Sequence, residues 1–327
     1  MPNMRLGQLL PSGFTLVLVL VLALAFFLPA RGWAAGFFDQ LSSLAIALLF
    51  FLHGARLPGS QILSAFGYFR LHGAILFLTY GIFPLLGLAL RPVILPYLGQ
   101  DLYAGMLFLC ALPSTIQTSI AMTGMARGNV PAALSSATLS NVLGVFLTPV
   151  IVGSLIAFAV MGSGGDTGFQ SIWTIMKHLL FPFILGQVLH KRLIAFIRRA
   201  APVLRYTDQS VILLVIYTVF GAGVQAGVWD LIAVNALVAL VVICLLLLVL
   251  VLMIALLFSR VGGFPRHDEI PLIFCGAQKS LASGVSMAKI LLVGSSLGIM
   301  ILPLMVFHQI QLLVCASIAS HYARKAT

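Results

Sequence analysis

The chain has 327 residues, of which 61% are hydrophobic and 8% are charged, and its mean hydropathy is +1.15. A soluble domain is about a quarter charged, so this composition excludes a chain that is dissolved in water throughout. The net charge of +11 does not indicate a nucleic-acid partner, because the Lys and Arg residues lie between apolar segments, as they do in the cytoplasmic loops of membrane proteins.

Apolar windows long enough to cross a bilayer recur along the whole chain and predict an all-α polytopic membrane protein. About ten spans are expected, near 13–30, 41–56, 70–90, 102–126, 131–160, 172–197, 208–227, 230–258, 269–289 and 294–320. The first run resembles a signal peptide, but it is longer than a usual signal h-region, so we expect a first spanning helix. The four cysteines lie inside apolar runs without CxxC spacing, so we expect no disulfide and no cysteine metal site.

The basic residues fall mostly on one side of these spans. That side carries Arg5, Arg56, Arg70, Arg127, Lys191, Arg192, Arg198, Arg199, Arg205, Arg260, Arg266, Arg324 and Lys325, and the other side carries Arg31, Arg91, Lys177 and Lys289. Short basic loops face the cytoplasm, so both termini are expected there, in the inner (plasma) membrane. The segment 188–207 is predicted as a basic loop that sets topology and contacts anionic lipid, with a specific partner site as the alternative. We expect a monomer, with a dimer through Gly- and Ala-rich surfaces as the alternative.

The predicted spans divide into two halves around the Gly-rich connector 162–168. Five spans in each half give the halves opposite orientations, which is the inverted-repeat plan of many secondary transporters. Residues 1–161 and 169–327 are therefore predicted to be the two repeats. The fourth span of each half is interrupted at a comparable place, which supports this division.

The two interrupted spans carry the candidate site. In the first, Pro113 removes a helix N–H donor and is followed by a cluster of hydrogen-bonding residues, Ser114, Thr115, Gln117, Thr118 and Ser119. In the second, Gly276 is followed by Gln278, Lys279 and Ser280. Unwound backbone at membrane depth is tolerated only where it faces protein or a wet cavity, and half-helix ends offer N–H and C=O groups to ions and anions. The alternative is a proline kink whose Ser and Thr side chains merely satisfy the backbone.

Lys279 is the most informative residue, because a lysine at mid-span costs about 2.5–3.5 kcal/mol on insertion scales and has no interface within reach. It could be a fixed ammonium in a cation site, a titrating amine or an anchor for an anionic substrate. All seven acidic residues lie in predicted loops or at helix ends. A cation site must therefore use neutral oxygens, and a proton site must use Lys or His. His308, Gln309 and Gln311 of the last span could line the same cavity.

Three stretches resemble the bile acid:sodium symporter (SBF-like) superfamily: 48–57 with its His53-Gly54, 113–149, and Gly276 to Ser280. Residues 278–280 and 307–311 are similar to the divergent branch related to sodium/bile acid cotransporter 7. The resemblance implies a core unit of spans 3–5 and 8–10 and a panel unit of spans 1, 2, 6 and 7. It also implies that spans 4 and 9 cross at their breaks, that sodium binds inside the core, and that substrate binds between the units.

Carrying the sodium ligands of the family over to this chain reveals departures. The Ser-Asn pair of span 4 becomes Thr118-Ser119, the Glu of span 9 becomes Phe274, and the Gln-Asn pair becomes Gln278-Lys279. The Gln of span 3 corresponds to Thr79. Two hydroxyl ligands of span 5 become alanines, Ala133 and Ala137, with Ser136, Thr138, Ser140 and Asn141 nearby. A sodium ion could still be held by Thr118, Ser119 and Gln278. Replacing Glu and gaining Lys makes the site more positive by two charges, which disfavours two sodium ions.

The sequence therefore predicts a secondary active, symporter-like transporter for a small organic anion, working by alternating access. Lys279 argues against normal sodium coupling and leaves coupling to protons, no coupling, or coupling to one sodium as hypotheses, with Na⁺ or H⁺ as the candidate coupling ion and no other cofactor. A non-transporting membrane regulator or scaffold with the same fold is the alternative. An enzyme is disfavoured, because the chain has no paired membrane carboxylates, no HExxH motif and no GxSxG elbow.

Overall fold

The computed structural model describes residues 13–56, 68–159, 169–227, 229, 233–292 and 296–324, and the regular elements in these ranges are helices. Eight stretches are long and apolar enough to span a membrane: Trp33–Arg56, Phe69–Ala89, Arg91–Ala111, Val130–Leu155, Leu180–Ile197, Tyr206–Gln225, Val234–Val261 and Leu297–Arg324. The chain is thus a polytopic α-helical membrane protein, since a helix satisfies most of its backbone hydrogen bonds internally and can therefore cross a bilayer.

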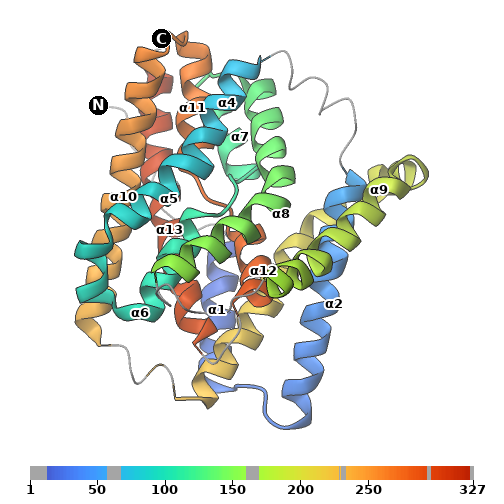
Figure 1. The fold of residues 1–327 in the computed structure, drawn as a ribbon. Helices are drawn as coiled ribbons and strands as arrows, with labels where there is room; N and C mark the ends of the chain where they lie inside the picture. Colours follow the sequence, from blue (N-terminus) through green and yellow to red (C-terminus); the bar gives the residue numbers. More distant parts are fainter. Residues whose placement is uncertain are drawn as a thin grey trace.

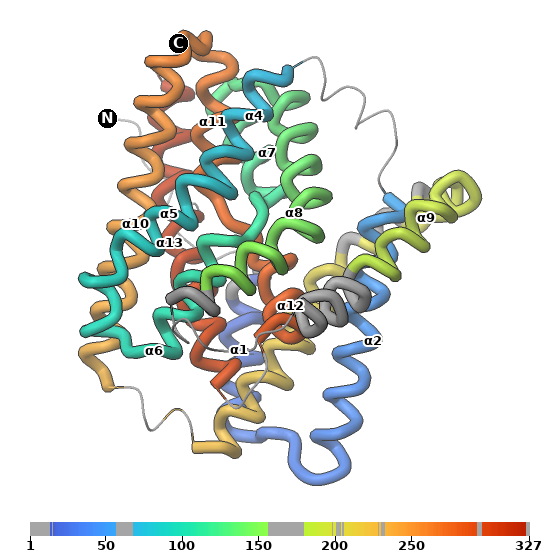
Figure 2. The backbone as a smooth tube through the Cα atoms, viewed as in Figure 1, coloured from blue at the N-terminus to red at the C-terminus, as the bar shows by residue number. Residues whose placement is uncertain are grey.

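The helices are arranged in two groups (Figures 1 and 2). Helices α4, α5, α6, α7, α8, α10, α11 and α13 gather in one group, α2 and α9 lie beside it, and α1 and α12 lie where the two meet. The bounds are α1 Gly13–Phe27, α2 Trp33–Arg56, α4 Phe69–Phe77, the π-helix η3 Leu78–Ile82, α5 Phe83–Ala89, α6 Arg91–Cys110, α7 Gln117–Met125, α8 Val130–Ala159, α9 Phe169–Gln225, α10 Val234–Val261, α11 Arg266–Ala277, α12 Leu281–Leu291 and α13 Leu297–Arg324.

The prediction of a loop at 188–207 was wrong, because α9 is helical from Phe169 to Gln225. This basic segment is rich in Leu, Ile, Ala and Arg, which favour helix. The chain nevertheless reverses within it, since the part near residue 183 and the part near residue 208 both approach the end of α2. The second span also differs from its prediction, because α2 begins at Trp33 rather than near residue 41.

Helices α2 and α9 pack with their backbones in close contact. A Cβ atom on Gly54 would lie 2.0 Å from the carbonyl oxygen of Phe183, and one on Gly186 would lie 2.0 Å from that of Phe51. Small residues allow such approach between membrane helices. At the end of the contact, Arg56 forms an ion pair with Asp208 at 3.1 Å. The two helices are therefore held as one unit.

We expect Gly54→Ala to lower the thermal unfolding midpoint of the purified protein, because the added methyl overlaps backbone that cannot move aside. Overpacking of this kind costs about 1–3 kcal/mol. Gly36→Ala is the matched control on the same helix, since a Cβ at Gly36 would have no atom within 4 Å. Equal midpoints for the two variants would show that the close contact does not contribute to stability.

Two helix pairs in the larger group are interrupted in its interior. Helix α6 ends at Cys110 and α7 begins at Gln117, while α11 ends at Ala277 and α12 begins at Leu281. The breaks touch, since the amide of Ser280 donates a hydrogen bond to the carbonyl oxygen of Pro113 at 3.0 Å. The structure thus interrupts both predicted spans, the first around Pro113 and the second directly after Gly276 and Ala277, and the contact between the breaks positions the site.

Candidate functional site

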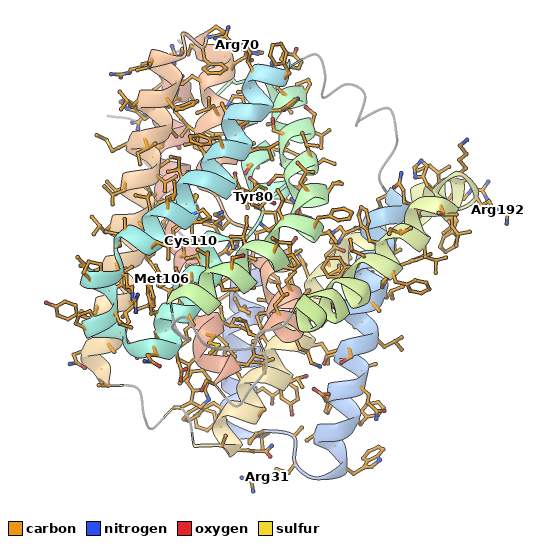
Figure 3. All side chains as sticks on the ribbon, in the orientation of Figure 1. Arg31, Arg70, Tyr80, Met106, Cys110 and Arg192 are labelled. Carbon is orange, nitrogen blue, oxygen red and sulfur yellow. The ribbon has the colours of Figure 1, made fainter. Side chains whose placement is uncertain are left out.

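Lys279 lies at the crossing of the two breaks and is fully buried. Its Nζ atom donates hydrogen bonds to three backbone carbonyl oxygens, those of Thr79 at 2.8 Å, Cys110 at 2.9 Å and Leu112 at 2.7 Å. Figure 3 shows Tyr80 and Cys110 in this interior region, between Arg70 at one end of the molecule and Arg31 at the other. An ammonium group has three donors, so this lysine is fully satisfied without a carboxylate.

These carbonyls are available because each belongs to an irregular piece of helix. Cys110 and Leu112 stand at the end of α6, where carbonyl groups lack an intrahelical partner and the helix dipole is negative. Thr79 belongs to the π-helix, a local widening of the helix that occurs frequently at functional sites. The oxygens that meet Lys279 therefore form a cage that suits a monovalent cation, and the lysine's own ammonium occupies it.

Two aromatic rings complete the surroundings of this ammonium. The ring centroid of Phe83 lies 4.1 Å from Lys279 Nζ and that of Tyr80 lies 6.0 Å away. A cation over an aromatic face is attracted by the ring quadrupole. The sequence interpretation missed both residues. The only available signal was that Phe83 follows Thr79 by four positions, which places the two on one helix face.

A second group of neutral oxygens surrounds Gln278. Its Oε1 atom accepts hydrogen bonds from the hydroxyls of Thr118 at 2.9 Å and Ser119 at 3.1 Å. Ser119 also donates to the carbonyl oxygen of Phe274 at 3.3 Å, and Thr118 donates to the hydroxyl of Thr115 at 3.1 Å. The buried Nε2 atom of Gln278 has no partner among the described residues.

This second group fits a single sodium ion by its chemistry. Hydroxyl, amide and carbonyl oxygens from both broken helices meet there, and unwound backbone of this kind coordinates sodium in transporters with broken helices. Phe274 is buried and apolar where the resemblance expected a carboxylate, so the group lacks the negative charge that would favour a second cation.

The short extended segment between α11 and α12, which carries Lys279, is also held in place by α13. Gln311 Oε1 accepts from the Lys279 amide at 2.8 Å, and its Nε2 donates to the Lys279 carbonyl at 2.9 Å. His308 Nδ1 lies 2.9 Å from Gln311 Nε2. Gln309 is only half-buried and is not joined to this network.

Three of the other candidates, Ser280, Gly276 and Asn141, make contacts that stabilise the crossing of the two breaks, and Gln117 does not. Ser280 caps α12, its hydroxyl accepting from the amide of Ser283 at 3.2 Å, and Gly276 lies so close to Leu78 that a Cβ would come within 2.8 Å. The carbonyl oxygen of Ser114 accepts from Asn141 Nδ2 at 2.6 Å. Gln117 is exposed, so the structure leaves it outside the crossing.

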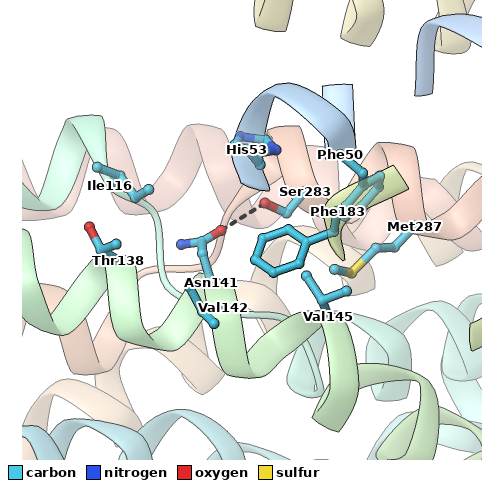
Figure 4. A pocket seen from close by; sticks show the side chains of 10 residues that line it. All are labelled: Phe50, His53, Ile116, Thr138, Asn141, Val142, Val145, Phe183, Ser283 and Met287. Carbon is cyan, nitrogen blue, oxygen red and sulfur yellow. Dashed lines mark hydrogen bonds between the residues drawn. The ribbon is translucent and has the colours of Figure 1, made fainter. Parts of the chain in front are cut away.

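A cavity of about 50 Å³ lies beside the crossing, against α2 and α9 (Figure 4). Thr138 and Asn141 lie toward one end, and Phe50, Phe183 and Met287 lie toward the other. Ser283 donates to Asn141 Oδ1 at 2.9 Å. Ten residues line it: Phe50, His53, Ile116, Thr138, Asn141, Val142, Val145, Phe183, Ser283 and Met287. Thr138 and Asn141 were expected near the site, whereas the sequence interpretation gave His53 no role in it.

A family model described as the SBF-like CPA transporter family matches residues 12–324. The chain belongs to this family. It is 49% identical to the uncharacterised protein PA2026 of Pseudomonas aeruginosa over 97% of this chain and 95% of that one. It is 43% identical to YfeH of Escherichia coli (strain K12), named as a proposed symporter, over 98% and 96% of the two chains. Sodium/bile acid cotransporter 7 of Mus musculus is 27% identical over 84% of this chain and 80% of its own.

As a member of the SBF-like CPA transporter family, the chain combines two features at one crossing. The first is a cation that is part of the chain and is held by carbonyl groups, and the second is a set of neutral oxygens around Gln278. The family is one of transporters. The resemblance stated from residues 113–149 and 276–280 is thereby confirmed.

Proposed function

We propose that the protein is a secondary active transporter for a small organic anion in the inner (plasma) membrane, with both termini in the cytoplasm. The observation that carries this proposal is the buried Lys279 ammonium at the crossing of two broken helices. The crossing lies beside a cavity, and Asn141 of the cavity wall donates a hydrogen bond to Ser114 at the first break. Half-helix crossings of this kind form substrate and ion sites in transporters. Membership of a transporter family supports the same conclusion.

The proposed mechanism is alternating access between two units. We assign α1, α2 and α9 to a panel and the remaining helices to a core, and residues 1–161 and 169–327 to two inverted five-span repeats. The close packing of α2 on α9 at Gly54 and Gly186 supports a rigid panel. The cavity is lined by residues of both units, such as His53 of α2 and Asn141 of α8. Relative movement of the units would expose it to each side of the membrane in turn.

The proposed coupling follows from the charges at the crossing. Lys279 supplies a permanent occupant for the carbonyl cage, so this position does not exchange ions during transport. The oxygens of Thr118, Ser119 and Gln278 leave room for one sodium ion at most. The cavity beside the crossing favours transport over a non-transporting regulator, because a scaffold has no need of a lined cavity between its units.

The direct test is uptake of a radiolabelled organic anion into proteoliposomes. Wild-type protein is expected to accumulate the anion, and the Lys279→Ala variant is expected to lose accumulation because the crossing loses its only charge. Labelled taurocholate is a suitable first probe, since a relative is named as a bile acid cotransporter. Binding of the anion without any movement into the liposomes would favour the regulator.

Sodium stoichiometry is testable without a substrate. The thermal unfolding midpoint should be measured in sodium chloride and in choline chloride at equal ionic strength, because an ion that binds only the native state raises apparent stability. We expect the dependence on sodium concentration to correspond to no more than one ion. Any rise should disappear when Thr118→Val and Ser119→Ala are combined. A dependence that fits two cooperative sodium ions would contradict the assignment of Lys279 to a cation position.

A further inference from the structure

His53 is the one side chain with an ionisable group among the ten that line the cavity. It lies on α2 directly before Gly54 (Figure 4), and its ring stands edge-on to that of Phe50 at 6.2 Å. Within the described part of the chain, no hydrogen bond engages its ring nitrogens. His53 therefore has donor capacity that a molecule in the cavity could use.

Of the other three polar side chains in the cavity wall, Asn141 and Ser283 are already engaged, and Thr138 contributes an uncharged hydroxyl. Ser283 donates to Asn141 Oδ1, and Asn141 Nδ2 donates to the carbonyl oxygens of Ser114 and Ala137. Lys279 does not line the cavity, and its three donors are taken by carbonyl groups. The built-in ammonium can thus not bind a solute directly while its cage is intact.

The charged groups that face His53 come from α2 and α9. Arg56 and Asp208 form an ion pair at 3.1 Å and carry charges of opposite sign. His190 of α9 is held by the carbonyl oxygen of Ala55 at 2.7 Å and does not line the cavity. Ile116, which directly precedes α7, and the residues that α8 and α12 contribute to the cavity wall carry no charge.

We propose that His53 is the proton-carrying and anion-recognising residue of this transporter. Protonated His53 binds the head group of an organic anion. Separation of the two units widens the cavity of about 50 Å³, so that Phe50, Phe183 and Met287 contact the apolar body of the anion. One proton and one monovalent anion then cross together, and the proton leaves the imidazole when the anion dissociates. This inference rests on the proposed function and adds its coupling ion and its recognition residue.

The physical reason is the cost of moving an uncompensated charge into a membrane protein. An anion that enters a neutral, mostly apolar cavity is strongly disfavoured unless a positive charge enters with it. Histidine is suited to supply that charge, because its proton exchanges between pH 5 and 8. Lys279 lies outside the cavity lining and gives its three donors to carbonyl groups, so it is not placed to exchange a proton with an anion in the cavity.

The test uses a probe whose own charge does not change with pH, so that any pH dependence belongs to the protein. Binding of naphthalene-2-sulfonate and of taurocholate to the purified full chain should be measured as a shift of the unfolding midpoint at pH 5.5 and pH 8.0. Wild-type protein is expected to bind at least one of them about tenfold more tightly at pH 5.5, the gain of one charge-assisted hydrogen bond.

Three variants make the result specific. His53→Gln is expected to bind weakly at both pH values, and His53→Lys, with a constant positive charge, is expected to bind well at both. His267→Gln is the matched control, since His267 is exposed and distant from the cavity lining, and it should behave as wild type. His53→Lys also guards against misfolding of the glutamine variant, because anion-dependent stabilisation requires a folded protein.

The outcomes separate this inference from the function on which it rests. Anion binding that is independent of pH, or that keeps its pH dependence in His53→Gln, would overturn the role of His53 and leave anion transport standing. Failure of wild-type protein to bind either anion at either pH would count against the anion-transport function itself. Binding of neutral naphthalene-2-methanol with the same pH dependence would also overturn recognition of the anion by His53.

Discussion

Replacing Lys279 by alanine is expected to destabilise the protein strongly in choline and to create a sodium dependence that the wild type lacks at this position. The substitution leaves the carbonyl groups of Thr79, Cys110 and Leu112 buried without a donor. A buried polar group that is left without its hydrogen-bond partner costs about 1–3 kcal/mol. The measurement is the unfolding midpoint of the purified variant in sodium and in choline at equal ionic strength.

The expected rescue by sodium follows from the geometry of the cage. The three carbonyl oxygens lie 2.7–2.9 Å from the ammonium nitrogen, so they already converge on one small cation. Removal of the side chain opens space for an ion in the same place, and rings of carbonyl oxygens replace the hydration shell of an ion in channel filters. Sodium should therefore restore part of the lost stability by mass action.

The Lys279→Met variant separates the effect of losing the positive charge from the effect of opening space for an ion. It removes the ammonium but fills much of the same volume, so it should be destabilised in choline and should gain little from sodium. If alanine and methionine variants respond equally to sodium, or if neither is less stable than the wild type, the carbonyl cage is not a cation position.

Cross-linking α12 to α2 at Lys289 and Asp39 is expected to stop transport completely. Lys289 Nζ lies 3.0 Å from Asp39 Oδ1 and donates to the Asp39 carbonyl oxygen at 2.8 Å and to the hydroxyls of Ser42 and Ser43. These contacts join the proposed core to the proposed panel. Alternating access requires the two units to separate there in the other state.

The experiment combines Asp39→Cys with Lys289→Cys and joins the two by a short bis-methanethiosulfonate, with uptake measured before and after reduction. All four native cysteines are buried, which limits background reaction. Uptake should fall to background when the link forms and return when it is reduced.

A cross-link inside one unit is the matched control. Phe38 and Tyr217 both belong to the proposed panel, and their ring centroids are 5.3 Å apart. Linking cysteines at these positions should leave transport intact, because the panel moves as one body. Full activity of the linked Asp39→Cys/Lys289→Cys protein would contradict movement between α2 and α12.

The sequence alone was sufficient to predict the structural features that depend on local composition. Long apolar runs require membrane helices because the bilayer offers no hydrogen-bond partner for backbone groups. Both helix interruptions could be predicted from neighbouring residues, Pro113 with the polar residues that follow it and Gly276 with Gln278 and Lys279. The prediction of a loop at 188–207 was wrong because hydropathy does not report whether a polar segment is helical. Hydropathy reports a lower apolar content at that segment, but a helix persists wherever its own hydrogen bonds form.

The contents of the site were decided only by tertiary structure. Lys279 meets Thr79, which lies 200 positions away in the sequence, and Gln278 meets Thr118 across 160 positions. Backbone carbonyls carry no residue-specific signal, so no pattern of side chains could identify the cage, and Phe83 looks like any apolar residue until its ring faces the ammonium. His53 lines the cavity for the same reason, because packing of α2 on α9 turns it toward α8 and α12. The sequence thus determined that a charge lies within the membrane, and the fold determined which atoms stabilise it and which residue remains available to a solute.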